Sequence, residues 1–260
     1  MNLSVRKSVE ARVYKYRLNH FDKTEWGKNL KKLKNKYEGK RCFIIGNGPS
    51  LQSTDLDRLQ NEYTFAFNRI YYIFGQTSWR PTFYCTQDEK IIENSAVEIL
   101  QNIDTEYLFL PATANWYKNA GIQTNYLFAP KYVQDGPIGF SEDIPSGIFV
   151  GNTVVYTAIQ LAYYMGFTEI YLIGVDHNFS VYQDKDGEIH RDNSVKDYFC
   201  SEYNVDKDKL DIPTLDKSTL DYRTARKFSE EHDFKIYNAT RGGKLEVFER
   251  VDIEDLFRIL

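Results

Sequence analysis

Short apolar segments alternate with longer amphipathic segments over most of the chain. Residues 41–46, 64–68 and 169–174 are apolar at nearly every position, a pattern typical of strands that are buried on both faces of a parallel sheet. Residues 88–103 and 153–165 instead place apolar side chains at helical spacing, which predicts two amphipathic helices. The same criteria predict further strands at residues 82–85, 107–110 and 234–237, and further helices at residues 55–59, 220–231 and 253–260.

This alternation predicts an α/β fold with a Rossmann-like, mostly parallel sheet and helices on both of its faces. We expect residues 38–260 to form this nucleotide-binding domain. Within it, residues 130–150 are rich in proline and glycine and are predicted to form a loop. Residues 178–215 are acidic, contain few core residues and exceed the usual length of a connection, so we expect a lid-like insertion there.

Residues 1–37 differ in charge from the rest of the chain. They contain 11 lysines and arginines and three acidic residues, so this segment carries +8 while the remaining 223 residues carry −12. Val5, Val9, Val13 and Tyr16 recur at helical spacing, which predicts a basic helical extension of one or two helices. Such an extension either packs on the domain as a solvated helix or contacts an anionic membrane surface or an acidic partner.

The composition excludes several classes of protein. Of the 260 residues, 42% are hydrophobic, which is enough for a large core and excludes a disordered chain. No segment approaches the roughly 18 apolar residues of a membrane-spanning helix, and we expect no secretory signal. Cys42, Cys85 and Cys200 are far apart, which argues against a disulfide framework or a zinc cluster and fits a cytoplasmic protein. The net charge of −4 argues against nucleic acid as the main partner.

Polar residues stand directly after the predicted strands, where open α/β sheets bind their ligands. The first strand ends in a turn with two glycines, whose backbone N–H groups would be free to meet a phosphate or a ribose. This turn has neither the spacing of a GxGxxG motif nor the lysine of a Walker A loop. The residues expected to bind a nucleotide here are Asn47, Gly48, Pro49 and Ser50 after the first strand, Asn68 and Arg69 after the second, Asp88 after the third, and Asp176 after the strand at residues 169–174.

A second turn, formed by Gly151, Asn152 and Thr153, precedes the helix predicted at residues 153–165. Asn152 or Thr153 can cap that helix, and the free N–H groups of its first turn form an anion site. Two such turns on one edge of a sheet favour a binding site for the phosphate of a nucleotide.

His177 and His190 are the candidate general bases. His177 follows Asp176, so this pair would supply a base and an acid, whereas His190 lies in the predicted insertion. No metal site is predicted. Residues 184–187 favour a hairpin turn over a calcium loop, and the Asp-x-Asp pair at residues 206–208 lies in a polar segment rather than at a strand end.

The order of these motifs resembles the 6-hydroxymethylpterin diphosphokinase MptE-like family and the related bacterial sialyltransferases of glycosyltransferase family 42. The resemblance covers roughly residues 38–258 and leaves the basic extension outside. It is specific in the combined order of the motifs rather than in any single one. The segments that carry it are IIGNGPSL (residues 44–51), FNRIY (67–71), GNT and the helix after it (151–167), EIYLIGVDH (169–177), and YNAT with the tail to residue 256 (237–256).

The resemblance implies that Asn47, Gly48, Ser50, Asn68 and Asp176 lie around a CMP-sugar. It also implies that a histidine and tyrosines near the acceptor act in catalysis.

The resemblance marks Tyr198, the second residue of an Asp-Tyr pair, as one of these tyrosines. The histidine that precedes this pair in the family aligns with Ser194, so His190 or His177 would act as the base instead. Cys85 stands where the sialyltransferases carry an asparagine that contacts the nucleotide.

We therefore expect a glycosyltransferase of surface polysaccharide or glycan assembly. It would use a nucleotide-activated sugar, in the first place a CMP-linked sialic-acid-type donor, by direct displacement with a histidine as general base. One alternative is an ATP-dependent 6-hydroxymethylpterin diphosphokinase with Mg²⁺ bound by Asp88 and Asp176. Another is a non-catalytic module that binds a nucleotide or a sugar.

The expected partners are a nucleotide-sugar donor and a glycan or lipid-linked acceptor, without nucleic acid. Residues 1–37 would contact the inner face of the membrane as a peripheral attachment. No cofactor is expected to be obligatory, and both a role for Mg²⁺ and homo-oligomerisation are left open.

Overall fold

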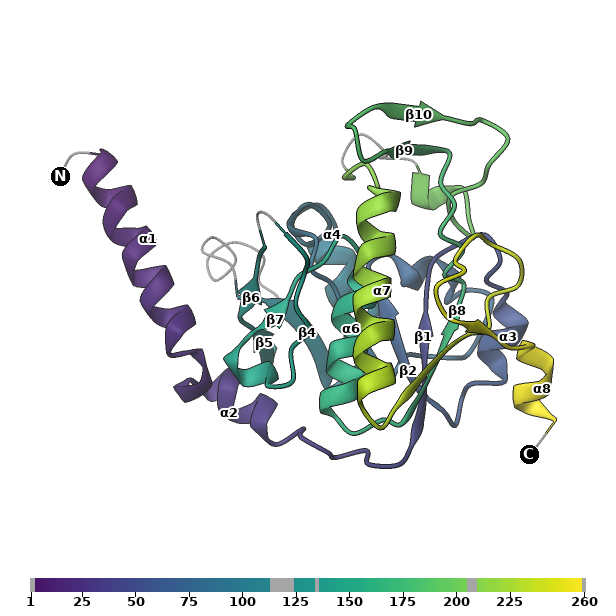
Figure 1. Cartoon of the computed structure of the whole chain (residues 1–260), viewed down its shortest axis with the longest axis horizontal. Helices are drawn as coiled ribbons and strands as arrows, with labels where there is room; N and C mark the ends of the chain where they lie inside the picture. Colours follow the sequence, from purple (N-terminus) through teal and green to yellow (C-terminus); the bar gives the residue numbers. More distant parts are fainter. Residues whose placement is uncertain (1–2, 113–123, 134–135, 205–209, 259–260) are drawn as a thin grey trace.

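The computed structural model describes residues 3–112, 124–133, 136–204 and 210–258 (Figure 1). Its main sheet consists of β1 (Arg41–Ile45), β2 (Tyr63–Phe67), β3 (Phe83–Cys85), β4 (Tyr107–Pro111), β5 (Tyr126–Phe128), β8 (Glu169–Ile173), β11 (Lys235–Asn238) and β12 (Glu249–Arg250). The order is β12-β11-β8-β1-β2-β3-β4-β5, and every neighbouring pair is parallel. The predicted Rossmann-like α/β class is therefore confirmed.

Burial on both faces explains why these segments form strands. Residues 42–45 of β1 and 170–173 of β8 are all buried, and consecutive side chains of a strand point to opposite faces, so both faces must be covered. The helices that cover the sheet and extend from it are α1 (Leu3–Asn19), α2 (Glu25–Lys31), α3 (Ser53–Asp57), α4 (Glu89–Asn102), α6 (Val154–Tyr164), α7 (Leu215–Glu231) and α8 (Ile253–Phe257). Helices α6 and α7 lie side by side on one face (Figure 1).

The basic extension consists of two helices, α1 and α2, with different surroundings. Leu30 in α2 and Leu33 in the turn after it are buried, and Trp26 Nε1 donates a hydrogen bond to the carbonyl of Thr124 over 3.1 Å. Helix α2 therefore packs on the edge of the sheet at β5. Helix α1 points away from the body of the molecule and exposes Tyr16 (Figure 1). Within the described part of the chain, no helix has the length and apolarity that crossing a membrane requires.

The insertion at residues 178–215 covers the carboxyl ends of the strands. It contains the antiparallel hairpin of β9 (Val181–Gln183) and β10 (Ile189–Arg191), which confirms the predicted hairpin turn. Figure 1 shows this hairpin above the edge of the sheet. The N–H of Phe199 donates to the carbonyl of Asn47 over 3.1 Å, which attaches the insertion to the turn after β1.

Three sequence predictions differ from the structure. Strands β5 and β12 were not predicted because they are too short to show a periodic pattern. The loop predicted at residues 130–150 contains the paired strands β6 (Pro130–Lys131) and β7 (Ile148–Phe149). Helix α7 begins at Leu215 rather than at residue 220, because its first turns bury the polar Ser218 and Asp221 instead of apolar side chains.

Candidate functional site

A cavity of about 760 Å³ opens at the carboxyl edge of the main sheet. Its walls are the ends of β1, β2 and β8, the starts of α4 and α6, and parts of the insertion. Strand β1 has β2 on one side and β8 on the other, so the strand order reverses at β1. Such a switch point leaves a crevice between the two following loops, which is the usual ligand site of this fold class.

The structure brings ten of the predicted site residues to this cavity. Pro49, Ser50, Arg69 and His190 do not belong to its lining. Tyr203, Thr214 and Tyr222 line it without having been predicted, because they lie in the insertion or in α7 rather than at a strand end. Gln87 also lines it and stands at a strand end, two positions after β3 and beside the predicted Asp88. The ten are Asn47, Gly48, Asn68, Asp88, Gly151, Asn152, Thr153, Asp176, His177 and Tyr198.

Gly48 and Asp176 are in close contact at the switch point. A Cβ atom on Gly48 would stand 1.9 Å from Asp176 Oδ2, so this contact requires glycine. Ser50 Oγ donates to the same carboxylate oxygen over 2.7 Å, and burial raises the pKa of Asp176. The N–H of Gly48 donates to the carbonyl of Gly174 over 2.9 Å, and that of Ser50 to Asp176 Oδ2 over 3.4 Å. The expectation that these two amides are free to bind a phosphate is therefore wrong.

Asn47 lines the cavity and has a buried hydrogen-bond acceptor. Its Nδ2 group donates to the carbonyl of Phe67 over 3.2 Å and to the hydroxyl of Tyr203 over 3.3 Å. Its Oδ1 is buried and has no hydrogen-bond partner within the described residues. A buried acceptor without a donor costs free energy, so this oxygen is suited to a hydroxyl or amino group of a ligand.

Asn68 lies at the end of β2 in the left-handed backbone conformation, with φ of 49°. Its side-chain oxygen accepts a hydrogen bond from Thr86 Oγ1 over 2.8 Å, and its backbone carbonyl accepts one from the Tyr84 hydroxyl over 2.7 Å. These bonds hold the turn after β2 against β3.

The lining of the cavity is acidic. Asp88 caps α4 by accepting the N–H groups of Lys90 over 2.8 Å and Ile91 over 3.3 Å, and burial raises its pKa. Lys90 forms an ion pair with Asp211 and is the single lysine or arginine among the described residues of the lining. The acidic residues of the lining are Asp88, Glu89, Glu93, Asp176, Asp197 and Asp211.

Asp221 of α7 holds the turn before α6. Its carboxylate accepts the N–H of Asn152 over 2.5 Å and Asn152 Nδ2 over 3.1 Å, and a Cβ on Gly151 would lie 2.6 Å from its Oδ2. Thr153 caps α6 by accepting the N–H of Val155 over 3.3 Å. The N–H of Asn152 is thus bonded within the protein rather than free for an anion. Sequence reasoning missed Asp221 because it is separated from Asn152 by 69 positions.

His177 lies beside the cavity with φ of 53°, and its Nε2 is 2.8 Å from Thr219 Oγ1. Thr219 donates its only hydroxyl proton to the carbonyl of Leu215 over 2.8 Å, so His177 Nε2 must donate and Nδ1 carries the lone pair. Burial lowers the pKa of His177 to about 4. The ring is therefore neutral at neutral pH and can accept a proton at Nδ1.

Tyr198 stacks on the buried ring of Tyr203, with centroids 3.8 Å apart and planes at 16°. Burial raises the pKa of Tyr198 far above its ordinary value, so its hydroxyl stays protonated and can donate a hydrogen bond. The buried Arg69 donates to Ser95 Oγ over 3.2 Å and to the carbonyl of Tyr203 over 3.3 Å. The Arg69 guanidinium thus links the insertion, through Tyr203, to Ser95 of α4.

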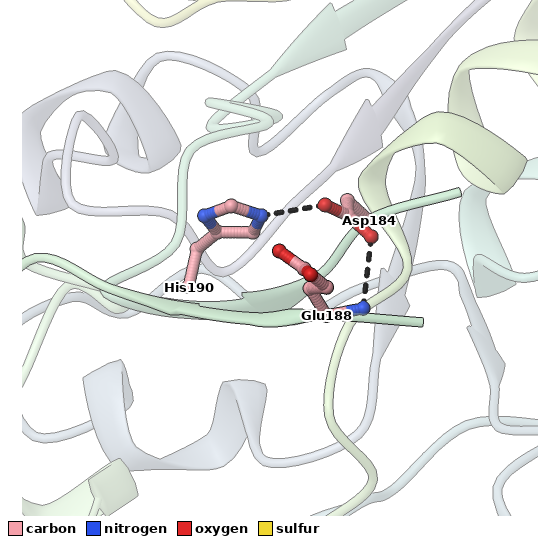
Figure 2. Close-up of side chains that lie close together, drawn as sticks. All are labelled: Asp184, Glu188 and His190. Carbon is pink, nitrogen blue, oxygen red and sulfur yellow. Dashed lines mark hydrogen bonds and ion pairs between the residues drawn. The ribbon is translucent and has the colours of Figure 1, made fainter. Parts of the chain in front are cut away.

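His190 lies on β10 outside the cavity. Figure 2 shows its ring directed at Asp184, and its Nε2 is 2.6 Å from Asp184 Oδ2. The other oxygen of Asp184 accepts the N–H groups of Asp186 and Glu188 over 2.9 Å each, as expected for a residue that closes a hairpin turn. Asp184, Glu188 and His190 offer three ligand atoms within 4.8 Å of one another, but these hydrogen bonds already account for their arrangement. The Asp-x-Asp pair at residues 206–208 lies outside the described residues.

Comparisons with known proteins identify the family. Among solved structures, the chain is similar to the sialyltransferase CstII from Campylobacter jejuni in complex with the substrate analogue CMP-3FNeuAc, with 18% identity, a TM-score of 0.45, and coverage of 82% of this chain and 85% of that chain. It is also similar to the MAf glycosyltransferase from Magnetospirillum magneticum AMB-1, with 11% identity, a TM-score of 0.42, and coverage of 90% of this chain and 38% of that chain.

These identities are too low to transfer an activity from either structure. A comparison with curated protein sequences finds no match. Residues 16–181, more than half of the chain, match the family described as 6-hydroxymethylpterin diphosphokinase MptE-like. This segment includes the turn after β1, the start of α6 and the Asp176-His177 pair, and by this match the chain belongs to the 6-hydroxymethylpterin diphosphokinase MptE-like family.

Proposed function

We propose that the protein is a glycosyltransferase that transfers a sugar from a CMP-linked sialic-acid-type donor to a glycan or a lipid-linked acceptor. The observation that carries this proposal is a neutral histidine, His177, beside a cavity at the switch point of the sheet. The volume of this cavity, about 760 Å³, suits a nucleotide-sugar. Asn47 Oδ1 would accept a hydrogen bond from a hydroxyl or amino group of the donor.

The charge of the cavity supports a donor with a single phosphate. Six acidic side chains and one lysine line it, so an unaccompanied polyphosphate would meet strong repulsion. The phosphodiester of a CMP-sugar carries one negative charge and the carboxylate of a sialic-acid-type sugar a second, whereas the triphosphate of ATP carries about four. A CMP-linked donor is therefore the nucleotide substrate that this lining tolerates best without a divalent cation.

The proposed reaction is a direct displacement. The acceptor hydroxyl forms a bond to the anomeric carbon, the bond from this carbon to the phosphate oxygen breaks, and CMP leaves with the electron pair. His177 Nδ1 takes the proton of the acceptor hydroxyl. The protonated hydroxyl of Tyr198 is available to stabilise the departing phosphate oxygen.

A second candidate function is the diphosphokinase reaction that the family description names. It is favoured by Asp88 and Asp176, two carboxylates that line the cavity. Magnesium bound by these residues would neutralise part of the charge of ATP and of the acidic lining. The two functions therefore differ in the nucleotide that binds and in the need for Mg²⁺.

A thermal-shift panel of CMP, CDP, UDP, GDP and ATP, with and without Mg²⁺, tests both functions. A ligand that binds the native state raises the melting temperature by mass action. Stabilisation by CMP without metal, followed by turnover of a CMP-sugar, is the expected result. Stabilisation by ATP only in the presence of Mg²⁺ would contradict the glycosyltransferase proposal and support the diphosphokinase.

The base is tested by a matched pair of substitutions, His177→Asn and His190→Asn. Asparagine tolerates the left-handed backbone of residue 177, so this change removes the base without straining the turn. We expect His177→Asn to bind CMP but to lose turnover by at least about a hundredfold, in the range of general-base catalysis. If His190→Asn loses turnover and His177→Asn does not, His190 is the general base instead.

A peripheral contact of residues 1–37 with an anionic membrane surface belongs to the same proposal. It is supported by the charge of this segment, +8, and by the position of α1 away from the body of the molecule (Figure 1). Such a contact would bring the cavity close to a lipid-linked acceptor.

A further inference from the structure

A second hollow lies next to His177. It encloses about 380 Å³ between α7 and residues 244–247. His177 and Thr219 belong to its lining, and His177 also lines the nucleotide cavity. One residue, His177, therefore belongs to the walls of both hollows.

The two hollows have opposite charge. The nucleotide cavity has six acidic residues and one lysine in its lining, whereas basic residues predominate in the second hollow. We call the second hollow the basic groove. Its charged residues are Arg223, Arg226, Lys227 and Lys244, together with Glu230 and Glu246.

Both acidic residues of the basic groove already have a partner. Glu230 pairs with Arg226 of the groove over 2.8 Å, and Glu246 pairs with Arg250, which lies outside the lining, over 2.7 Å. Arg223, Lys227 and Lys244 form no ion pair with any residue in the described part of the chain. Among the described residues, these three side chains are thus not held in an ion pair, and the charge of Lys244 also acts on the carboxylate of Asp192.

The walls of the basic groove are fixed to the nucleotide cavity. The N–H of Lys244 donates to the carbonyl of Asp176 over 2.7 Å, and Arg226 Nη1 donates to the carbonyl of Val247 over 3.0 Å. Leu245 between them is fully buried. The segment that carries Lys244 is therefore attached both to α7 and to the Asp176-His177 turn.

We propose that the basic groove binds an anionic group of the acceptor, a phosphate or a carboxylate, and so places the acceptor hydroxyl at His177. The assignment of this anion to an acceptor rests on the proposed function, in which a donor fills the nucleotide cavity. The binding of an anion to the groove does not depend on it. The groove explains how an acidic active site attracts an acceptor that is itself anionic, since the acceptor approaches from the positively charged side.

The experiment is an NMR titration of the full chain with inorganic phosphate at constant ionic strength, with chloride as the reference anion. We expect the amide signals of residues 223–227 and 244–247 and the imidazole signals of His177 to shift together. The charge reversal Arg223→Glu with Lys227→Glu should raise the dissociation constant for phosphate at least about tenfold. Lys217→Glu is the matched control, because it reverses an exposed charge of the same helix outside the groove, and it should change the constant less than about twofold.

Shifts that map elsewhere, no shifts at all, or equal weakening in all variants would overturn the proposal. Vesicles of phosphatidylcholine with and without phosphatidic acid then distinguish the source of the anion. A loss of binding to the phosphatidic acid vesicles in the double reversal, relative to the unmodified chain, would identify a lipid-borne phosphate. Binding of inorganic phosphate with no such loss would identify a soluble acceptor.

A CMP titration of the same sample separates this inference from the proposed function. If CMP leaves the nucleotide cavity unchanged while phosphate shifts the groove signals, the anion site stands and the CMP-donor assignment fails. If CMP binds and phosphate does not reach the groove, the donor assignment stands and the anion site fails.

Discussion

At the scale of single residues, burial changes the acid–base chemistry of His177. The sequence suggests a base with an ordinary pKa near 6.5, whereas burial lowers the pKa to about 4. Its Nε2 proton is held by Thr219, which leaves Nδ1 as the basic atom. A base of low pKa is neutral and ready to accept a proton over a wide pH range, but it holds that proton weakly.

The lowered pKa predicts a dependence of stability on pH. As pH falls below about 6.5, the unfolded chain protonates this histidine while the folded chain does not, until pH approaches about 4. The contribution of His177 is thus complete above about pH 6.5 and is lost as pH falls from there to about 4. Between about pH 7.5 and about pH 5 we expect a loss of roughly 2 kcal/mol in the free energy of unfolding. Urea denaturation at both pH values measures it.

The variant His177→Asn provides the control for this measurement. Other titrating groups contribute equally to both proteins, so the difference between their pH dependences isolates His177. If the two proteins lose the same free energy of unfolding between these pH values, the burial of a neutral imidazole at this position is not supported.

At the scale of elements, the cavity depends on contacts between helices that are distant in sequence. Helix α7 holds the turn before α6 through the Asp221 carboxylate, which takes both the backbone N–H and the Nδ2 group of Asn152. Because the side-chain NH₂ group of Asn152 is directed at α7, its side-chain oxygen Oδ1 lies on the other side. There it accepts a hydrogen bond from Thr214 Oγ1 over 3.3 Å, at the edge of the cavity. Asp221 is therefore a positioning residue for Asn152.

The change Asp221→Asn tests this role. It preserves the shape and one acceptor oxygen. That oxygen can take the place of Oδ2, which accepts both the backbone N–H and Nδ2 of Asn152, while the new NH₂ group replaces Oδ1, which lies 3.4 Å from the same Nδ2. We expect the melting temperature to change by only a few degrees and the affinity for the bound nucleotide to fall about fivefold, since the loss of a hydrogen bond that orients Asn152 costs about 1 kcal/mol. Calorimetry of unfolding and of CMP binding measures both.

The double variant Asp221→Asn with Asn152→Asp is the matched control, because it exchanges the two groups and restores each hydrogen bond. It should recover the affinity that the single variant loses. An unchanged affinity in Asp221→Asn, or no recovery in the double variant, would show that Asp221 only stabilises the fold.

At the scale of the whole molecule, charge is divided between an acidic domain and a basic extension. Residues 1–37 carry +8 and the rest of the chain −12. Helix α2 of the extension is part of the packed structure, whereas α1 projects from it and exposes Arg12, Lys15 and Arg17 (Figure 1). The free surface of α1 is thus the part of the extension that is available to an anionic partner.

We expect the full chain to bind vesicles that contain phosphatidylserine and not vesicles of phosphatidylcholine alone. Replacing Arg12, Lys15 and Arg17 by glutamine should weaken this binding about a hundredfold, at about 1 kcal/mol for each charge near the surface. Co-sedimentation with vesicles at increasing salt measures the effect, because screening reduces such binding. Equal binding of the two proteins, or binding that salt does not reduce, would contradict a contact through α1.

The local sequence pattern was sufficient to predict the main strands and most of the helices. Consecutive apolar residues such as those of β1 and β8 can be accommodated only in a sheet that is covered on both faces, so their role is visible without a structure. The caps Asp88 and Thr153 are likewise local, because each side chain bonds to an N–H group two residues ahead. The edge of the sheet that carries the site follows from the parallel order of the strands.

The chemistry of the site depends on neighbours that no local pattern reveals. The amides of Gly48 and Asn152 are free in the local turns but are bonded to Gly174 and Asp221, which approach only in the folded chain. Burial sets the low pKa of His177, and the desolvation that causes it is a property of packing. Short-range sequence patterns therefore indicated the edge of the sheet where the candidate site lies, whereas long-range packing determined the hydrogen bonds and protonation states of its residues.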